Sequence, residues 1–95
     1  MREVRTFSQI CNLAYLHESD NIITTHGFAD GDESLHNKIA IWDSKTLKKK
    51  TILSGHIQRV IYLTVNNNGR IAVTGSSDET LRFWRLNNEK ERFEP

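Results

Sequence analysis

Hydrophobic residues along this chain recur at alternate positions, and no stretch stands out with the 3.6-residue period of an amphipathic helix. Seven short runs are rich in Ile, Leu, Thr and aromatic residues, and each fits a β-strand of about four to eight residues. They cover residues 9–16, 21–26, 38–42, 50–53, 59–65, 70–75 and 80–84. The single proline stands at position 95, so no proline interrupts a run. The pattern therefore predicts an all-β chain.

Turn-forming residues separate these runs. Asn66-Asn67-Asn68-Gly69 is the strongest signal, because Asn-Gly readily adopts the positive φ angles of a tight hairpin. Ser76-Ser77-Asp78-Glu79 is a second one. Residues 87–95 are nearly all polar, and we expect a disordered tail there.

Two tryptophans mark an internal repeat. Trp42 and Trp84 each end a predicted strand, and they lie 84 − 42 = 42 residues apart. A period of about 40–45 residues with such a tryptophan is the signature of WD-repeat propeller blades. The sequence therefore predicts a β-propeller fragment of two four-stranded antiparallel blades, in residues 1–53 and 54–86. No apolar run follows Trp84, so we expect the last blade to lack its outer strand.

The second repeat carries the polar residues expected inside such a blade. His56 opens it, Thr74 and Asp78 follow, and Trp84 closes it. We expect the carboxylate to hold the imidazole, the imidazole to reach the hydroxyl, and the hydroxyl to reach the indole N–H. Each buried polar atom would then have a partner.

The first repeat is a poorer copy. Trp42 keeps its place, but Phe7 stands where the opening histidine is expected. From Phe7 to Trp42 is 35 residues, whereas His56 to Trp84 is 28, so the first repeat contains an insertion. We expect most of the extra residues between positions 28 and 38.

Composition and charge exclude several classes of function. Thirteen basic and twelve acidic residues give a net charge of +1, which offers no general attraction for nucleic acid or a membrane surface. The lysines at 48–50 stand on a predicted outermost strand, where they discourage unwanted strand pairing. No run approaches the ~20 apolar residues of a membrane span. We expect a location in the cytoplasm, the nucleus or both.

No motif for catalysis or metal binding is present. Ser76, His56 and Asp78 supply the residue types of a hydrolase triad, but no nucleophile elbow accompanies them. Cys11 is the only cysteine, and its spacing from the histidines does not match a zinc site. We therefore expect neither an enzyme nor a cofactor.

Residues 8–86 resemble the last two of seven blades in the Fizzy and Fizzy-related proteins, which are WD-repeat activators of the anaphase-promoting complex. Four stretches carry the resemblance: Ser8-Gln9-Ile10-Cys11, His26-Gly27-Phe28-Ala29, Gly55-His56-Ile57-Gln58-Arg59-Val60-Ile61-Tyr62-Leu63 and Asp78-Glu79-Thr80-Leu81-Arg82-Phe83-Trp84. The last is the most specific, because a generic WD repeat usually reads Asp-Gly or Asp-Lys where this chain reads Asp-Glu.

The resemblance implies that the chain binds degron peptides and promotes their ubiquitination by a separate ligase. Glu79 falls where the family places a carboxylate against the arginine of the Arg-x-x-Leu destruction box. Arg59 falls where a guanidinium meets the acidic part of the Lys-Glu-Asn (KEN) box, and Gln9 where an amide contacts the same peptide. The implied partners are the complex and degron-bearing cell-cycle proteins. Further blades, or a partner, would be needed to close the propeller.

Two alternatives remain open. The family's segments that grip the complex and its Ile-Arg tail are not found in this sequence, which favours a truncated, inactive relative. A generic WD-repeat scaffold in another assembly is the second alternative. Binding that depended on the lysines at 48–50 rather than on Glu79 and Arg59 would favour that scaffold.

Overall fold

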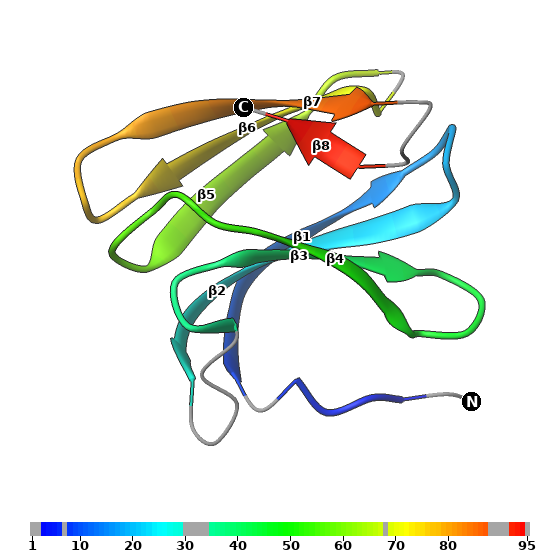
Figure 1. Ribbon diagram of the computed structural model, residues 1–95, viewed down its shortest axis with the longest axis horizontal. Helices are drawn as coiled ribbons and strands as arrows, with labels where there is room; N and C mark the ends of the chain where they lie inside the picture. Colours follow the sequence, from blue (N-terminus) through cyan, green and yellow to red (C-terminus); the bar gives the residue numbers. More distant parts are fainter. Residues whose placement is uncertain (1–2, 7, 30–34, 68, 88–91, 95) are drawn as a thin grey trace.

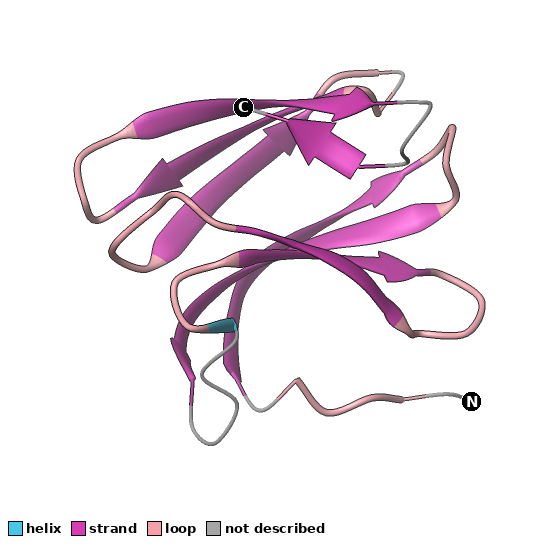
Figure 2. Ribbon diagram, in the orientation of Figure 1, coloured by secondary structure: helices cyan, strands magenta, loops and turns pink. Residues whose placement is uncertain are grey.

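The computed structural model describes residues 3–6, 8–29, 35–67, 69–87 and 92–94, which form two four-stranded antiparallel sheets (Figure 1). The first sheet contains β1 (Ser8–Leu16), β2 (Asn21–Ala29), β3 (Ile39–Asp43) and β4 (Lys49–Leu53). The second contains β5 (Val60–Val65), β6 (Ile71–Ser76), β7 (Leu81–Asn87) and β8 (Arg92–Glu94). Apart from a short helical turn at Leu35, the described residues are strands, turns and loops (Figure 2). The predicted all-β fold class is confirmed.

The Asn66–Gly69 turn fixes the register of the β5–β6 hairpin. The side-chain oxygen of Asn66 accepts hydrogen bonds from the backbone amides of Arg70, at 2.9 Å, and Ile71, at 3.1 Å. Gly69 has a φ of 71°, a left-handed conformation that glycine adopts at no steric cost. The resulting register places Leu63 opposite Thr74, so that Thr74 lies in the middle of the second sheet.

The hydrophobic core lies between the two sheets. One face of the first sheet packs against the Trp84-bearing face of the second, with buried residues at the centre and partly buried Ala14, Leu63 and Val65 packed against them. The core residues are Leu16, Ile23, Ile39, Ile41 and Leu53 from the first sheet, and Val60, Ala72 and Trp84 from the second. Fully burying one large aliphatic or aromatic side chain contributes roughly 1.5–3 kcal/mol, so this layer is the main reason that the sheets hold together.

The outer edge of the second sheet differs from the prediction. We expected no fourth strand after Trp84 and a disordered tail over residues 87–95. Instead β7 continues to Asn87, and the three residues of β8 pair with Arg85–Asn87. Backbone pairing alone defines so short a strand. A tail with a single aromatic residue gives no periodic pattern from which it could be predicted.

The face of the second sheet that points away from the first is apolar and open. Leu81 and Phe83 are 73% and 66% exposed, and Tyr62 beside them is 71% exposed. The equivalent residues of the first repeat are Ile39 and Ile41, because they stand three and one residues before Trp42, as Leu81 and Phe83 do before Trp84. Both isoleucines are 1% exposed, since the second sheet covers them. In the second sheet, nothing among the described residues covers this face.

Candidate functional site

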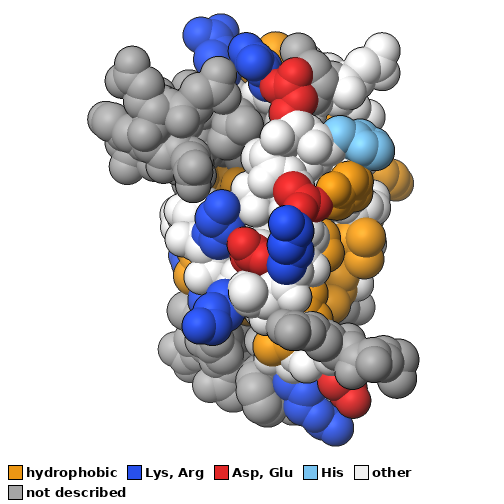
Figure 3. Space-filling view, turned by 90° about the vertical axis from the view of Figure 1, so that its right-hand side faces the viewer, with side chains coloured by type: hydrophobic (Ala, Val, Ile, Leu, Met, Phe, Trp, Pro, Cys, Tyr) orange, Lys and Arg blue, Asp and Glu red, His pale blue; other side chains and the backbone are white. Residues whose placement is uncertain are grey.

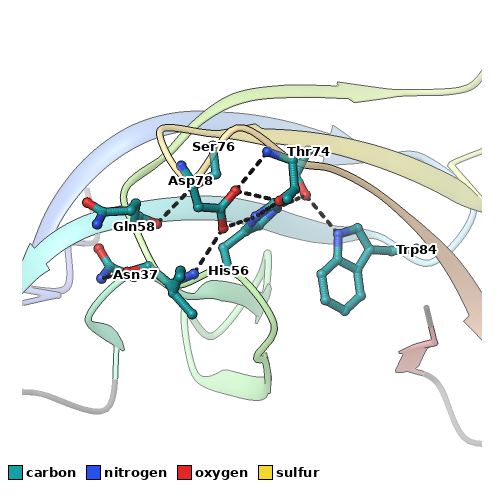
Figure 4. A network of polar contacts seen from close by, with 9 residues as sticks. Asn37, His56, Gln58, Thr74, Ser76, Asp78 and Trp84 are labelled. Carbon is teal, nitrogen blue, oxygen red and sulfur yellow. Dashed lines mark hydrogen bonds and ion pairs between the residues drawn. The ribbon is translucent and has the colours of Figure 1, made fainter.

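A chain of hydrogen bonds crosses the second sheet from the Asp78 turn to Trp84 (Figure 4). The carboxylate of Asp78 lies 3.0 Å from Nδ1 of His56, and Nε2 of His56 lies 2.8 Å from the hydroxyl of Thr74. The indole N–H of Trp84 donates to the same hydroxyl, at 2.9 Å. The four residues proposed from sequence for this blade are thus brought together. With the proton of His56 on Nδ1, each polar side-chain group in this series of hydrogen bonds has a donor or an acceptor.

Asp78 also organises the backbone around it. Its carboxylate accepts hydrogen bonds from the backbone amides of Ile57, at 3.0 Å, and Thr80, at 2.9 Å, and from the Thr80 hydroxyl. The Thr80 hydroxyl contributes most to holding the pKa of Asp78 well below its usual range, and the Ile57 amide and the His56 ring add to it. Asp78 is therefore a charged anchor that joins the β6–β7 turn to the segment leading into β5.

The first sheet has its own version of this chain, with the histidine in a different place. The indole N–H of Trp42 donates to the hydroxyl of Thr24 at 2.8 Å, and that hydroxyl lies 2.7 Å from Nε2 of His26. His26 follows Thr24 on the same strand, whereas His56 reaches its threonine from the segment before β5. Phe7, expected to replace the histidine, lies outside the described residues. His26 was not predicted, because the expected histidine position was at the opening of the repeat. Burial lowers the pKa of His26.

Glu79 stands at the tip of the β6–β7 turn, with a backbone conformation that is unfavourable for a residue other than glycine. Its φ is 70°, in the left-handed region where residues with a Cβ are uncommon. The turn is closed by a hydrogen bond from the Glu79 amide to the Ser76 carbonyl oxygen, at 3.1 Å, and the Ser76 amide reaches the Thr80 carbonyl oxygen at 3.2 Å. The Glu79 side chain is exposed. A local constraint thus presents this carboxylate to solvent.

Arg59 and Gln9 meet above Gly27. A Cβ placed on Gly27 would stand 2.7 Å from Cγ of Arg59 and 2.9 Å from Oε1 of Gln9, so both side chains lie directly on the β2 backbone. The β1–β2 ladder shifts register at Gln9, and such bulges re-aim side chains. Arg59 also lies close enough to Cys11 to oppose the rise in thiol pKa that burial causes. No role was predicted for Gly27, although a glycine inside a strand pattern signals close approach of another group.

The guanidinium of Arg59 and the carboxylate of Glu79 form no ion pair or hydrogen bond with any side chain in the described part of the protein. The opposite end of the sheets differs. There Nε of Arg70 lies 2.7 Å from a carboxylate oxygen of Glu18, and Nζ of Lys45 lies 3.8 Å from a carboxylate oxygen of Asp20. Figure 3 shows that end, with basic and acidic side chains side by side. Exposed charges at the Glu79 end, Arg59 and Glu79, are therefore open to a ligand, whereas the pairs at the opposite end bind each other.

The described residues contain no group of three or more His, Cys, Asp or Glu side chains that could hold a metal ion. No helix in the described ranges is long and apolar enough to cross a membrane. The exposed groups beside Arg59 include Phe28, which is 62% exposed, and Ile57, which is 77% exposed. The chemistry that this end offers is thus ionic and apolar contact with a ligand.

Comparison with known proteins points to one group of relatives. The chain is 44% identical over 89 residues to "Meiotic fizzy-related protein 1" of Schizosaccharomyces pombe. The alignment covers 94% of this chain and 20% of that protein. It is 40% identical over 86 residues to "Protein FIZZY-RELATED 2" of Arabidopsis thaliana, covering 90% of this chain and 17% of the relative. It is 37% identical over 86 residues to "Anaphase-promoting complex subunit cdh1" of Dictyostelium discoideum, covering 90% of this chain and 11% of the relative.

A solved structure agrees with these relatives. A chain in the "Crystal Structure of Mitotic Checkpoint Complex" superposes with a TM-score of 0.72 at 36% identity, over 87% of this chain and 24% of that one. A scan against models of protein families gave no match. The present chain spans 11% to 20% of the length of the three relatives described above.

Proposed function

This chain belongs to the Fizzy-related family of WD-repeat proteins, and from that premise we propose that it binds degron peptides for the anaphase-promoting complex. In this role it contributes no catalysis. It acts in the cytoplasm or nucleus by presenting degron-bearing cell-cycle proteins to a separate ubiquitin ligase. The observation that carries the proposal is the pair of exposed charges Arg59 and Glu79 at one end of the sheets, neither of which forms an ion pair with another described residue.

Arg59 and Gln9 suit a peptide that carries a carboxylate, as the KEN box does. The guanidinium supplies a fork of N–H donors whose charge-assisted hydrogen bonds are directional. The Gln9 amide, whose oxygen lies above Gly27 with Cγ and Cδ of Arg59, adds a neutral donor and acceptor. Such contacts set the register of a bound peptide more than they raise its affinity.

Glu79 suits the opposite charge, the arginine of a destruction box. The left-handed backbone at Glu79 supports this assignment, because glycine would occupy that position without steric cost. A glutamate kept at such a position is better explained by what its carboxylate binds than by the stability of the turn. The exposed carboxylate has no competing cation among the described residues.

We also propose that a further blade covers the open face of the second sheet. Leu81 and Phe83 occupy the positions of Ile39 and Ile41, which pack on a blade of the same kind. An apolar surface of this sort on a soluble protein marks an interaction site. A longer chain or a partner protein would supply that blade and complete the propeller.

The test is the affinity of the chain for a fluorescent peptide containing Lys-Glu-Asn, measured by anisotropy beside a Lys-Gln-Asn peptide. We expect Arg59→Gln to weaken binding of the first peptide about fivefold, the upper range for an exposed ion pair, and to leave the second unchanged. Arg85→Gln is the matched control, because Arg85 is exposed near the other end of β7. Equal affinity of wild type for both peptides would contradict the assignment of Arg59.

The alternatives predict other outcomes. A folded chain with no affinity for either degron peptide would favour the inactive relative. Binding of RNA that is lost on changing the lysines at 48–50, and that weakens steeply with salt, would favour the scaffold.

A further inference from the structure

We propose that Gly27 is a positioning residue for degron binding, because its missing side chain leaves the space in which Arg59 and Gln9 lie. The inference rests on the proposed function for its consequence in binding. The placement itself does not depend on that function. Gly27 is itself buried on β2.

The space above Gly27 is already filled by the two side chains. A Cβ there would approach Cγ and Cδ of Arg59 to 2.7 and 2.9 Å, and Oε1 of Gln9 to 2.9 Å. Carbon atoms in contact prefer separations of about 3.5–4.0 Å. Any residue other than glycine must therefore displace one or both side chains.

The backbone of Gly27 cannot retreat to relieve the clash. Its carbonyl oxygen accepts a hydrogen bond from the Asn37 amide at 2.9 Å, and the neighbouring His26 amide donates to the Lys38 carbonyl oxygen at 2.9 Å. These bonds tie the strand to the segment that leads into β3. The atoms that must move therefore belong to Arg59 and Gln9, whose side chains are exposed and free to swing into solvent.

The conformation of Gly27 gives no other reason for glycine. Among the four described glycines only Gly69 has a left-handed φ, so an alanine at position 27 would meet no backbone strain of that kind. Space above the backbone is the remaining requirement. We therefore expect Gly27→Ala to keep the fold and to lose the arrangement of the two ligand-facing groups.

The experiment compares wild type, Gly27→Ala and Gly75→Ala by ¹⁵N NMR. Gly75 is a matched control on β6, where a Cβ would meet its nearest atom, Cδ2 of Leu81, at an ordinary 3.4 Å. We expect the side-chain signals of Arg59 Nε and the Gln9 amide to move in Gly27→Ala alone. The indole signals of Trp42 and Trp84 should stay in place in all three proteins. Unmoved Arg59 and Gln9 signals, or lost indole signals, would overturn the proposal.

Peptide binding then tests the consequence. Gly27→Ala should weaken the Lys-Glu-Asn peptide about as much as Arg59→Gln does, roughly fivefold. In the Arg59→Gln background, Gly27→Ala should weaken binding of this peptide by less than about twofold more. The effects of two substitutions that act through one contact do not add. A fivefold loss of affinity on Gly27→Ala in both wild type and Arg59→Gln would contradict a positioning role. So would an unchanged affinity of Gly27→Ala although the Arg59 and Gln9 signals have moved. Moved signals in a protein whose wild type binds no peptide would instead reject the proposed function and leave the placement standing.

Discussion

The backbone amide of Ser77 donates a hydrogen bond to the backbone carbonyl oxygen of Arg59, at 3.1 Å. This bond joins the turn that carries Glu79 to the residue that enters β5. The amide of Ile57, bound to the Asp78 carboxylate at 3.0 Å, adds a second tie between the same two segments. The anionic and cationic groups of the candidate site are therefore held by one local framework, and each prediction below tests a part of it.

Thr74→Val should destabilise the chain by about 2 kcal/mol, because it leaves the Trp84 indole N–H and Nε2 of His56 buried without a partner. The substitution keeps the shape of the side chain, so loss of packing contributes little. Urea denaturation measures the change. Thr64→Val, at an exposed position on β5, is the control and should stay within about 0.5 kcal/mol of wild type. Equal stability of both variants would show that the hydrogen-bonded chain is not needed.

Glu79→Gly should fold about as stably as wild type, within roughly 0.5 kcal/mol, because relief of the left-handed conformation offsets the greater chain entropy of glycine. The same variant should lose affinity for an Arg-x-x-Leu peptide. Denaturation and peptide anisotropy on one preparation check both points. A variant that is markedly less stable would mean that Glu79 serves the turn, and one that binds the peptide normally would remove Glu79 from the site.

Stability should fall as the pH drops below the ordinary carboxyl range near 4. The folded state lowers the pKa of Asp78, so the unfolded chain takes up a proton first, and protonation favours unfolding. Above that range the contribution of Asp78 is fully present. Thermal melts of wild type and Asp78→Asn from pH 7 to pH 3 test the sign. Asp78→Asn should melt lower at pH 7 but lose less on acidification, and parallel curves would contradict the assignment.

The open face of the second sheet should make the isolated chain self-associate. Replacing Leu81 and Phe83 with glutamate should shift sedimentation towards the monomer. Ile57→Glu, which changes an equally exposed residue outside that face, should not. We also expect a weak, broad melt for the chain alone. A sharp monomeric transition above about 60 °C would contradict this view of an incomplete propeller.

The strands were predictable because alternation is a local property of the sequence. The run at 59–65 and the strand Val60–Val65 differ by one residue, and the Asn66–Gly69 turn forms where Asn-Gly indicated it. The second-sheet chain was visible because His56, Thr74, Asp78 and Trp84 keep their spacing.

What escaped prediction depends on contacts between distant segments. β8 exists through pairing with β7, and no pattern within its three residues announces it. His26 takes its role from the Thr24 hydroxyl on the same strand, to which the Trp42 indole donates from the neighbouring strand β3. The closeness of Arg59, Gln9 and Gly27 brings together β1, β2 and the residue before β5 and follows from how the sheets pack, so spacing along the chain could not reveal it.

The central claim is that the Arg59 and Glu79 end of the sheets binds degron peptides. The most direct measurement is an NMR titration of the ¹⁵N-labelled chain with a Lys-Glu-Asn peptide and, separately, with an Arg-x-x-Leu peptide. We expect the first peptide to shift the signals of Gln9, Gly27 and Arg59, and the second to shift those of the 76–80 turn. Shifts confined to the turns at 17–20 and 44–48, or no shifts with a folded chain, would contradict the account.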